Sequence, residues 1–202
     1  MIRGLRRRNI LAAALAFGLV TLARAGQPYS DDMALGNSKA QVSVIEYASV
    51  GCPHCAAWAI SVYPTFKARY IDTGKARYVF REMLTGQPTL AAAGFLTARC
   101  AAPAKYFEIV DAIFHAQEEM VQEGDAYGPL LRIAKNAGLT QDQFDACMKD
   151  QAALNALEAR SDRNGKDNGI AGTPTFVVGD RKLEGEQSIE SLGAAIAAAE
   201  RR

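Results

Sequence analysis

Two stretches of the chain have the composition of buried strands. Residues 41–50 read QVSVIEYASV and residues 77–84 read RYVFREML, and both are rich in β-branched and aromatic side chains. The first stretch is apolar along most of its length, which is typical of a central strand covered on both faces. We therefore predict two strands, the first of which ends just before Gly51.

A helix is predicted between these two strands. Apolar residues from Trp58 to Ile71 recur at near-helical spacing, and Pro64 within this run should kink the helix or divide it in two. A strand, a helix and a second strand in this order imply a right-handed crossover and a parallel pair of strands.

Between residues 88 and 168 the pattern changes to alanine-rich helical sequence without an internal repeat. Thr140 and Gln143 form a capping-box signal, and Gly138 is a suitable end for the helix before it. The predicted helices cover residues 90–101, 105–117, 127–137 and 151–163, with a further helical segment that begins after Thr140. We expect this insertion to pack directly on the sheet.

Strand-like sequence returns at residues 175–178 and 182–183, and the Gly179-Asp180 turn between them predicts a hairpin. A terminal helix over residues 189–200 follows, with Ser188 as its N-cap. The order of elements is therefore β, α, β, a helical insertion, β, β, α. This order predicts an α/β fold that is interrupted by helices.

The first 25 residues have the features of an export signal. A basic head precedes a short apolar run, residues 10–22, and Ala23-Arg24-Ala25 fits small-x-small cleavage. A membrane anchor is the alternative, but the run is shorter than the roughly 20 residues that span a bilayer. Arg7-Arg8 is compatible with twin-arginine export, so the route stays open. The predicted parts are an export signal at 1–25, a strand-based domain at 26–87 and 169–202, and an inserted all-helical domain at 88–168.

Removal of the signal changes the charge of the chain. The sequence has 23 Lys and Arg against 22 Asp and Glu, and five of the basic residues lie in residues 1–25. The remainder has a net charge of −4 and no basic stripe for a phosphate backbone, so we expect no nucleic-acid partner. An exported chain also meets an oxidising compartment, in which cysteines are paired or used for redox chemistry.

The stretch VGCPHC places Cys52 and Cys55 where the first strand ends and the helix begins. Unpaired N–H groups and the positive end of the helix dipole favour an anion there, and so a thiolate on Cys52. Pro53 is well tolerated in a first helical turn, and His54 adds a donor or a positive charge. A stabilised thiolate favours the dithiol over the disulfide, so we expect this pair to oxidise other thiols.

Two other uses of the pair have less support. A structural zinc site needs further ligands, but the chain has no second Cys-x-x-Cys and only one other histidine, His115. An inert disulfide between Cys52 and Cys55 closes so short a loop that it stabilises the fold little.

The stretch GTPTF, residues 172–176, is the second informative motif. A proline directly before an interior strand cannot donate to the sheet, so Pro174 lies either in an ordinary loop or after a cis bond. A cis bond would turn polar backbone groups outward beside the cysteines, where an extended substrate can pair with them. The upstream cysteine motif favours the cis alternative, with Thr173 and Pro174 as substrate-binding residues.

Together, VIEYASVGCPHC, the helical insertion and GTPTFVVGD resemble the DsbA-like thiol:disulfide oxidoreductases, over residues from about 42 to 199. The resemblance implies a thioredoxin fold with an inserted helical domain, an exposed nucleophile at Cys52, a buried resolving Cys55 and a cis-proline at Pro174. It also implies reduced exported proteins as substrates, re-oxidation by a quinone-linked membrane partner of the DsbB type, and no cofactor.

Glu46 lies on the predicted central strand, six residues before Cys52, where burial should raise its pKa unless it is paired. In the family that the sequence resembles, an acidic residue in this strand lies beneath the active site and helps proton transfer to and from the buried thiol. Pairing with a basic residue is the alternative for Glu46. Glu82, on the second strand, is a further candidate for the same region.

Thr173 leaves the direction of electron flow open, because isomerases of the same superfamily also favour threonine before the cis-proline. Those isomerases are usually dimers with an added N-terminal domain, for which about fifteen residues before the first predicted strand leave no room. We therefore predict a monomeric periplasmic oxidase. The alternatives are an isomerase or reductase, and a copper-binding protein that uses Cys52, His54 and Cys55.

Cys100 and Cys147 both lie near helix ends in the insertion. Two free thiols beside an oxidising site would be a hazard, and a second, non-catalytic disulfide occurs in some members of the family that the sequence resembles. We predict a structural disulfide that closes a loop of 48 residues, which the chain-entropy treatment values at ~4 kcal/mol.

Overall fold

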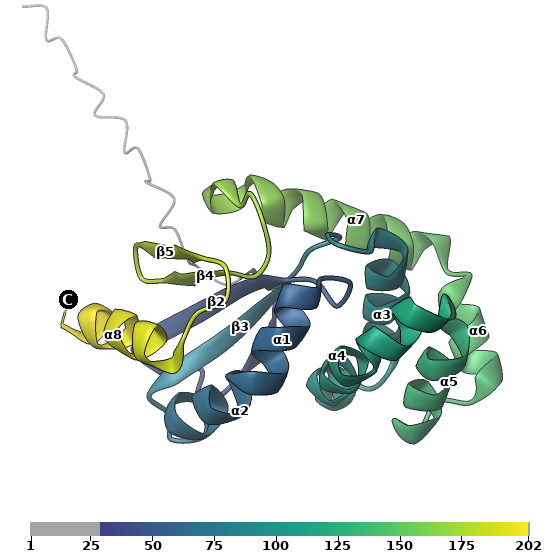
Figure 1. The fold of residues 1–202 in the computed structure, drawn as a ribbon, viewed down its shortest axis with the longest axis horizontal. Helices are drawn as coiled ribbons and strands as arrows, with labels where there is room; N and C mark the ends of the chain where they lie inside the picture. The colour runs from purple at the N-terminus through teal and green to yellow at the C-terminus, as the bar shows by residue number, and fades with distance from the viewer. Residues whose placement is uncertain (1–28, 202) are drawn as a thin grey trace, which may run out of the picture.

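The computed structural model describes residues 29–201 as a five-stranded mixed sheet with helices on both faces (Figure 1). The predicted export signal and its cleavage site near Ala25 lie outside the described residues. The strand order is β1-β3-β2-β4-β5. The strands are β1 Met33–Leu35, β2 Val42–Ala48, β3 Ala76–Glu82, β4 Thr175–Val178 and β5 Arg181–Glu184.

Strand β2 is the centre of the sheet. It pairs in parallel with β3 and antiparallel with β4, so that Glu46 lies opposite Phe80 on one side and Phe176 on the other. Every residue of β2 except Ser43 is buried, as the apolar composition of residues 41–50 predicts. The predicted parallel pair and the predicted hairpin between β4 and β5 are both confirmed.

The crossover from β2 to β3 is helical and divided at Pro64. Helix α1 (Pro53–Ser61) ends two residues before α2 (Tyr63–Phe66) begins, and a π-helical turn (Lys67–Ile71) follows. Pro64 lies in the first turn of α2, where its missing N–H costs no helical hydrogen bond. The predicted division of this helix is therefore confirmed.

The helical insertion is present as a group of helices on the right of Figure 1, with α7 lying over one face of the sheet. The capping box of Thr140 and Gln143 opens α6, and Ser188 caps the terminal helix, both as predicted. The remaining elements are α3 Pro88–Cys100, a 3₁₀ turn Pro103–Lys105, α4 Tyr106–Glu123, α5 Tyr127–Asn136, α6 Gln141–Met148, α7 Gln151–Lys166, a 3₁₀ turn Asp167–Gly169 and α8 Ile189–Glu200.

The apolar core fills both faces of the sheet. The larger cluster runs without a break from the sheet, through α1, into α3 and α4, and includes Trp58, Phe80, Phe95 and Ile113. The smaller cluster lies on the opposite face and consists of Ile45, Tyr47, Val79, Met83, Ile170 and Val177. The continuity of the larger cluster confirms that the insertion packs directly on the sheet. No helix within residues 29–201 is long and apolar enough to cross a bilayer.

Strand β1 was not predicted from the sequence. It adds to the free edge of β3 in antiparallel orientation, so the first strand begins at Met33 and not in residues 41–50. The residue just before β1, Asp32, is held by the buried guanidinium group of Arg81 on β3 at 3.2 Å. The same guanidinium group bonds Asp167 at 2.5 Å and the Tyr47 hydroxyl at 2.6 Å. Charged partners at a sheet edge, not an apolar pattern, therefore specify this strand.

Candidate active site

Cys52 and Cys55 lie at the junction that the sequence predicts. Cys52 is the N-cap of α1, with extended backbone angles, Pro53 is the first helical residue, and Cys55 lies in the first turn. Both cysteines carry free thiols in this structure. Cys52 is 6% exposed, less than the resemblance implied, because the Thr173 carbonyl oxygen lies 3.4 Å from its Sγ and covers it.

The two thiols have opposite acidities. The pKa of Cys52 is lowered to about 5, mainly because the Cys55 thiol donates a hydrogen bond to its thiolate. The Thr173 side chain and the backbone N–H groups of Cys55 and His54 add to this lowering, and burial opposes it. Burial raises the pKa of Cys55 far above its ordinary range, and the hydrogen bond to Cys52 and the charge of Glu46 raise it further. At neutral pH the pair therefore carries one thiolate, on Cys52.

His54 points away from the protein body and is held by Glu186. Its Nδ1 lies 2.7 Å from a carboxylate oxygen of Glu186, in the segment that joins β5 to α8. This hydrogen bond, the charge of Glu186 and the charge of Cys52 raise the pKa of His54, in that order. Within residues 29–201, no group of three or more His, Cys, Asp or Glu side chains is arranged to hold a metal ion.

The residues of the GTPTF motif lie against Cys52. The Thr173–Pro174 peptide bond is cis, and the strand β4 begins at the next residue. The Thr173 hydroxyl lies 2.7 Å from the hydroxyl of Thr85, and the Thr85 carbonyl accepts a hydrogen bond from the Ser49 hydroxyl at 2.9 Å. The structure thus links β2, the loop after β3 and the turn before β4 directly around the cysteine pair.

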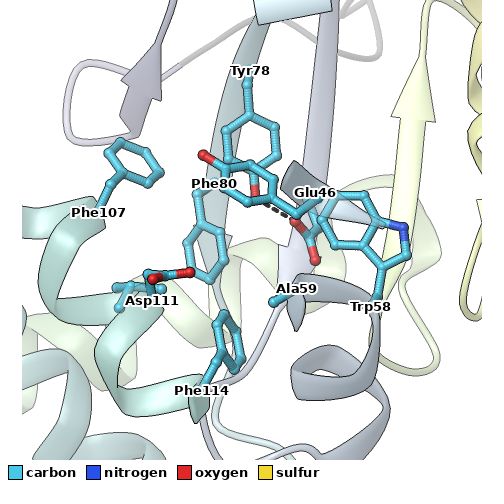
Figure 2. Close-up of a pocket in the computed structure, with 10 residues that line it drawn as sticks. Glu46, Trp58, Ala59, Tyr78, Phe80, Phe107, Asp111 and Phe114 are labelled. Atoms are coloured by element: carbon cyan, nitrogen blue, oxygen red, sulfur yellow. Dashed lines mark hydrogen bonds between the residues drawn. The ribbon is translucent and has the colours of Figure 1, made fainter. Parts of the chain in front are cut away.

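Glu46 is buried, close enough to the cysteines to interact with their charges, and its hydrogen-bond partner is the hydroxyl of Tyr78, not a basic residue. Burial raises the pKa of Glu46 to about 8, although the hydrogen bond from Tyr78 opposes the shift and the charge of Cys52 adds to it. Figure 2 shows the Tyr78 hydroxyl directed toward the Glu46 carboxyl group. A carboxyl group with this pKa is mostly protonated at neutral pH.

A small pocket lies against Glu46 between α1 and α4 (Figure 2). The volume that the centre of a water molecule can occupy in this pocket is ≈ 20 Å³, which is enough for one water. Asp111 on α4, half of whose side chain is exposed, also lines it. The other lining residues are Trp58, Ala59, Tyr63, Tyr78, Phe80, Phe107, Val110 and Phe114.

Glu82 does not join this site. Its buried carboxylate accepts hydrogen bonds from Arg99 at 2.6 Å, Arg160 at 3.0 Å and the Tyr106 hydroxyl at 2.9 Å. These partners all lie on helices of the insertion, Arg99 on α3, Tyr106 on α4 and Arg160 on α7. Glu82 pairs in register with Ala48, two residues further along the sheet than the Glu46–Phe80 pair. Of the two candidate glutamates, Glu46 and Glu82, only Glu46 lies at the site.

Gln117 on α4 also contacts the cysteine loop. Its amide Nε2 donates to the Val50 carbonyl at 2.6 Å and to the Cys52 carbonyl at 3.2 Å. A buried glutamine between two buried carbonyl groups ties the insertion to the start of α1. In the sequence this residue belongs to an ordinary amphipathic helix, and no local signal marks it.

Cys100 and Cys147 form a disulfide, which joins the end of α3 to α6 with Cα atoms 6.2 Å apart. The bond closes the loop across the insertion that the sequence analysis proposed. It lies among the helices of the insertion and does not belong to the group of residues around Cys52.

A cysteine pair at a strand-to-helix junction of a mixed sheet, with a cis-proline segment directly beside it, defines a thioredoxin-fold protein with a redox-type Cys-x-x-Cys motif. A family model described as Thioredoxin matches residues 29–198. The chain belongs to the thioredoxin family, and its relatives assign it to the DsbA-like thiol:disulfide oxidoreductases with a helical insertion.

Several relatives have names that fit this group. The chain is 34% identical over 167 residues to the "Putative protein-disulfide oxidoreductase" of Rickettsia bellii, covering 82% of this chain and 63% of the relative. The chain spans about three fifths of the length of the curated Rickettsia relatives that it matches. Among solved structures, Wolbachia pipientis alpha-DsbA1 has a TM-score of 0.76 at 27% identity, with 85% of this chain and 92% of that one covered. BdbD from Bacillus subtilis, at 23% identity, has the same fold with a TM-score of 0.77 over 89% of this chain and 98% of its own.

Proposed function

We propose that the chain is a dithiol oxidase that introduces disulfides into exported proteins through Cys52 and Cys55. The observation that carries the proposal is the contrast between the two thiols, with the pKa of Cys52 lowered to about 5 and that of Cys55 raised. The groups that stabilise the Cys52 thiolate lower the free energy of the reduced pair only, because the disulfide carries no charge. A pair whose reduced form is stabilised accepts electrons from other dithiols.

The reaction proceeds by two exchanges. A substrate thiolate attacks the Cys52 sulfur of the oxidised pair, a mixed disulfide forms, and the Cys55 sulfur leaves and takes up a proton. A second substrate thiolate then attacks the substrate sulfur of the mixed disulfide, and Cys52 leaves as a thiolate. Two electrons pass from the substrate dithiol to the enzyme, and the substrate gains a disulfide.

Glu46 supplies the proton that Cys55 takes up. Its raised pKa keeps a proton on the carboxyl group at neutral pH, and its charge is close enough to affect the pKa of Cys55. The ~20 Å³ pocket beside Glu46 gives one water access to this carboxyl group. His54 supports the thiolate by its charge, and Pro53 begins the helix that stabilises it.

Thr173 and Pro174 form the surface on which the substrate lies. The Thr173 carbonyl beside the Cys52 sulfur is an acceptor for an extended substrate segment, as in strand addition. The resemblance adds a periplasmic location, a monomeric state and re-oxidation by a quinone-linked membrane protein of the DsbB type. These three parts of the proposal depend on the resemblance alone.

A redox titration tests the proposal. The Cys52–Cys55 pair is equilibrated against glutathione, and the oxidised protein is mixed separately with a reduced substrate and with a scrambled one. We expect a potential well above the roughly −270 mV of thioredoxin, oxidation of the reduced substrate, and no rescue of the scrambled one.

Other outcomes of this experiment favour the alternatives. A potential near that of thioredoxin would overturn the oxidase proposal, and rescue of the scrambled substrate would favour an isomerase. Tight copper binding without oxidase activity would favour a metal-binding protein. As matched variants, the Cys52 thiolate of Cys55→Ser should attack a disulfide of the scrambled substrate, release a substrate thiol and accumulate as a mixed disulfide, and Cys52→Ser should form none.

A further inference from the structure

The segment between β5 and α8 is fixed beside the cysteine pair by three hydrogen bonds. The Gly185 N–H donates to the Pro174 carbonyl at 2.9 Å, and the Gln187 carbonyl accepts from the Trp58 indole at 2.9 Å. The Gln187 amide in turn donates to the Glu184 carbonyl at 2.8 Å. The buried Trp58 and the residue after the cis bond therefore determine where the residue between Gly185 and Gln187 lies.

That residue is Glu186, and its carboxylate contacts the imidazole of His54. The contact is 2.7 Å and joins residues 132 positions apart in the chain. The two side chains remain 72% and 43% exposed, so the pair lies at the surface next to the site that thiol substrates must reach. A fixed carboxylate that accepts a hydrogen bond from Nδ1 favours the doubly protonated imidazolium form.

We infer that Glu186 is a positioning residue for the redox reaction, which holds the His54 imidazolium beside Cys52 and so maintains the oxidising strength of the pair at neutral pH. The inference rests on the proposed function for its biological meaning, but its direct test does not. An imidazolium stabilises the thiolate, which exists only in the reduced pair, and therefore makes the pair a stronger oxidant.

The pH range of the effect follows from the groups around His54. Glu186 and the Cys52 thiolate are the charged groups that shift the His54 pKa, and both raise it. The stabilisation of the reduced pair by His54 is present at low pH and is lost as the pH rises through this raised pKa. Without Glu186, only the Cys52 charge raises the His54 pKa, so the same loss should occur at lower pH, closer to the ordinary histidine value of about 6.5. The wild-type protein should therefore be the stronger oxidant between about pH 6.5 and the raised pKa.

Below about pH 6 the difference should disappear or reverse. His54 is then charged in both proteins, and the variant Glu186→Gln lacks a negative charge near the thiolate. A change of sign with pH is not expected from a general loosening of the loop, which would weaken the pair at every pH.

The chain is suited to an NMR titration, because it contains only two histidines, His54 and His115. In Glu186→Gln, the His54 ring should titrate at lower pH than in the wild type. Glu186→Asp should restore part of the effect. Glu184→Gln is the matched control, since Glu184 is a neighbouring exposed carboxylate that pairs with Lys182 at 3.0 Å.

The redox consequence is measured as the equilibrium constant with glutathione from pH 5 to pH 8. At pH 7.5, Glu186→Gln should be a weaker oxidant than the wild type by roughly 1.5- to 5-fold, the range of an exposed ion pair. In a His54→Asn background the substitution should have no such effect at pH 7.5.

Two results would overturn the inference. One is a His54 ring that titrates at the same pH with and without Glu186. The other is a redox effect of Glu186→Gln that persists in the His54→Asn background. The equilibrium with glutathione needs no protein substrate, so an absence of oxidase activity would leave this test intact and would count against the proposed function alone.

Discussion

Glu46 affects stability and chemistry in opposite directions. Burial raises the pKa of this side chain to about 8, whereas a glutamate in an unfolded chain titrates near 4.3. The folded protein therefore binds one more proton between these two pH values. The stability contributed by Glu46 is fully present below about pH 4.3 and falls as the pH rises toward 8.

Glu46→Gln should raise the free energy of unfolding by roughly 3 kcal/mol at pH 7 and change it little at pH 4. The same substitution removes the proton that Cys55 takes up, so the rate of thiol exchange should fall. Chemical denaturation at several pH values and stopped-flow exchange with a dithiol substrate measure the two effects. An equal gain in stability at every pH would contradict the assignment of the raised pKa to Glu46.

Glu82→Gln is the matched control on the neighbouring strand. Glu82 is as buried as Glu46 but is paired with Arg99 and Arg160. Removal of its charge leaves two partly covered guanidinium groups without their partner, which should cost about 3 kcal/mol. Exchange rates should change little, since Glu82 lies outside the active site.

The sequence predicts some residues of the site and not others, for a physical reason. Cys52 and Pro174 belong to short motifs whose meaning is local, a strand-to-helix junction and a proline before a strand. Tyr78, Glu186 and Gln117 acquire their roles through contacts 32 to 132 positions away in the chain. Strand register and loop path determine these contacts, and neither can be read from a single stretch of sequence.

At the scale of elements, the loop after β3 packs backbone to backbone on the cysteine loop. Gly86 has a φ of +72°, and a Cβ atom there would lie 2.2 Å from the Gly51 carbonyl oxygen and 2.9 Å from the Cys52 Cα. The Gln87 N–H donates to the same Gly51 carbonyl at 2.9 Å. The position of Cys52 therefore depends on the absence of a side chain at residue 86.

Gly86→Ala should displace the cysteine loop, lower the rate of thiol exchange and reduce the free energy of unfolding by more than about 2 kcal/mol. Gly124→Ala is the control, because Gly124 has a similar φ of +66° but a Cβ atom at this position would meet nothing within 4 Å. This control should cost about 1 kcal/mol, from backbone strain alone, and should not affect exchange. Thermal or chemical denaturation and exchange kinetics compare the two variants. Equal losses in both would show that the close approach to Gly51 is unimportant.

Most elements follow from local signals in the sequence. Pro64 divides the crossover helix, and the capping box of Thr140 and Gln143 opens α6. Strand β1 is different, because its three residues have no strand pattern of their own and pair only where β3 offers an edge. The charges around Arg81 then hold the preceding residues in place.

At the scale of the whole molecule, the division into a strand-based domain and an inserted helical domain stays a prediction. One apolar cluster runs through both parts, and Gln117 joins the insertion to the cysteine loop. The Cys100–Cys147 disulfide is the covalent link within the insertion.

Replacement of Cys100 and Cys147 by alanine should lower the free energy of unfolding by up to ~4 kcal/mol, since their disulfide closes a loop across 47 positions. The redox pair should keep its equilibrium constant with glutathione. Denaturation of the variant and of the wild type, with the Cys52–Cys55 pair reduced in both, measures the difference. A thiol count on denatured, unreduced wild type provides the check, because two thiols beyond those of Cys52 and Cys55 would mean that the bond is not formed.

The Cys100–Cys147 disulfide is a bond of the type that the protein is proposed to introduce into other chains. A newly made copy arrives with four thiols, and two of them must lose their electrons before the insertion is covalently closed. If the Cys52–Cys55 pair oxidises other chains, finished molecules are available to oxidise new ones. The amount of mature protein would then depend on its own past production, so that recovery after depletion would start slowly and accelerate.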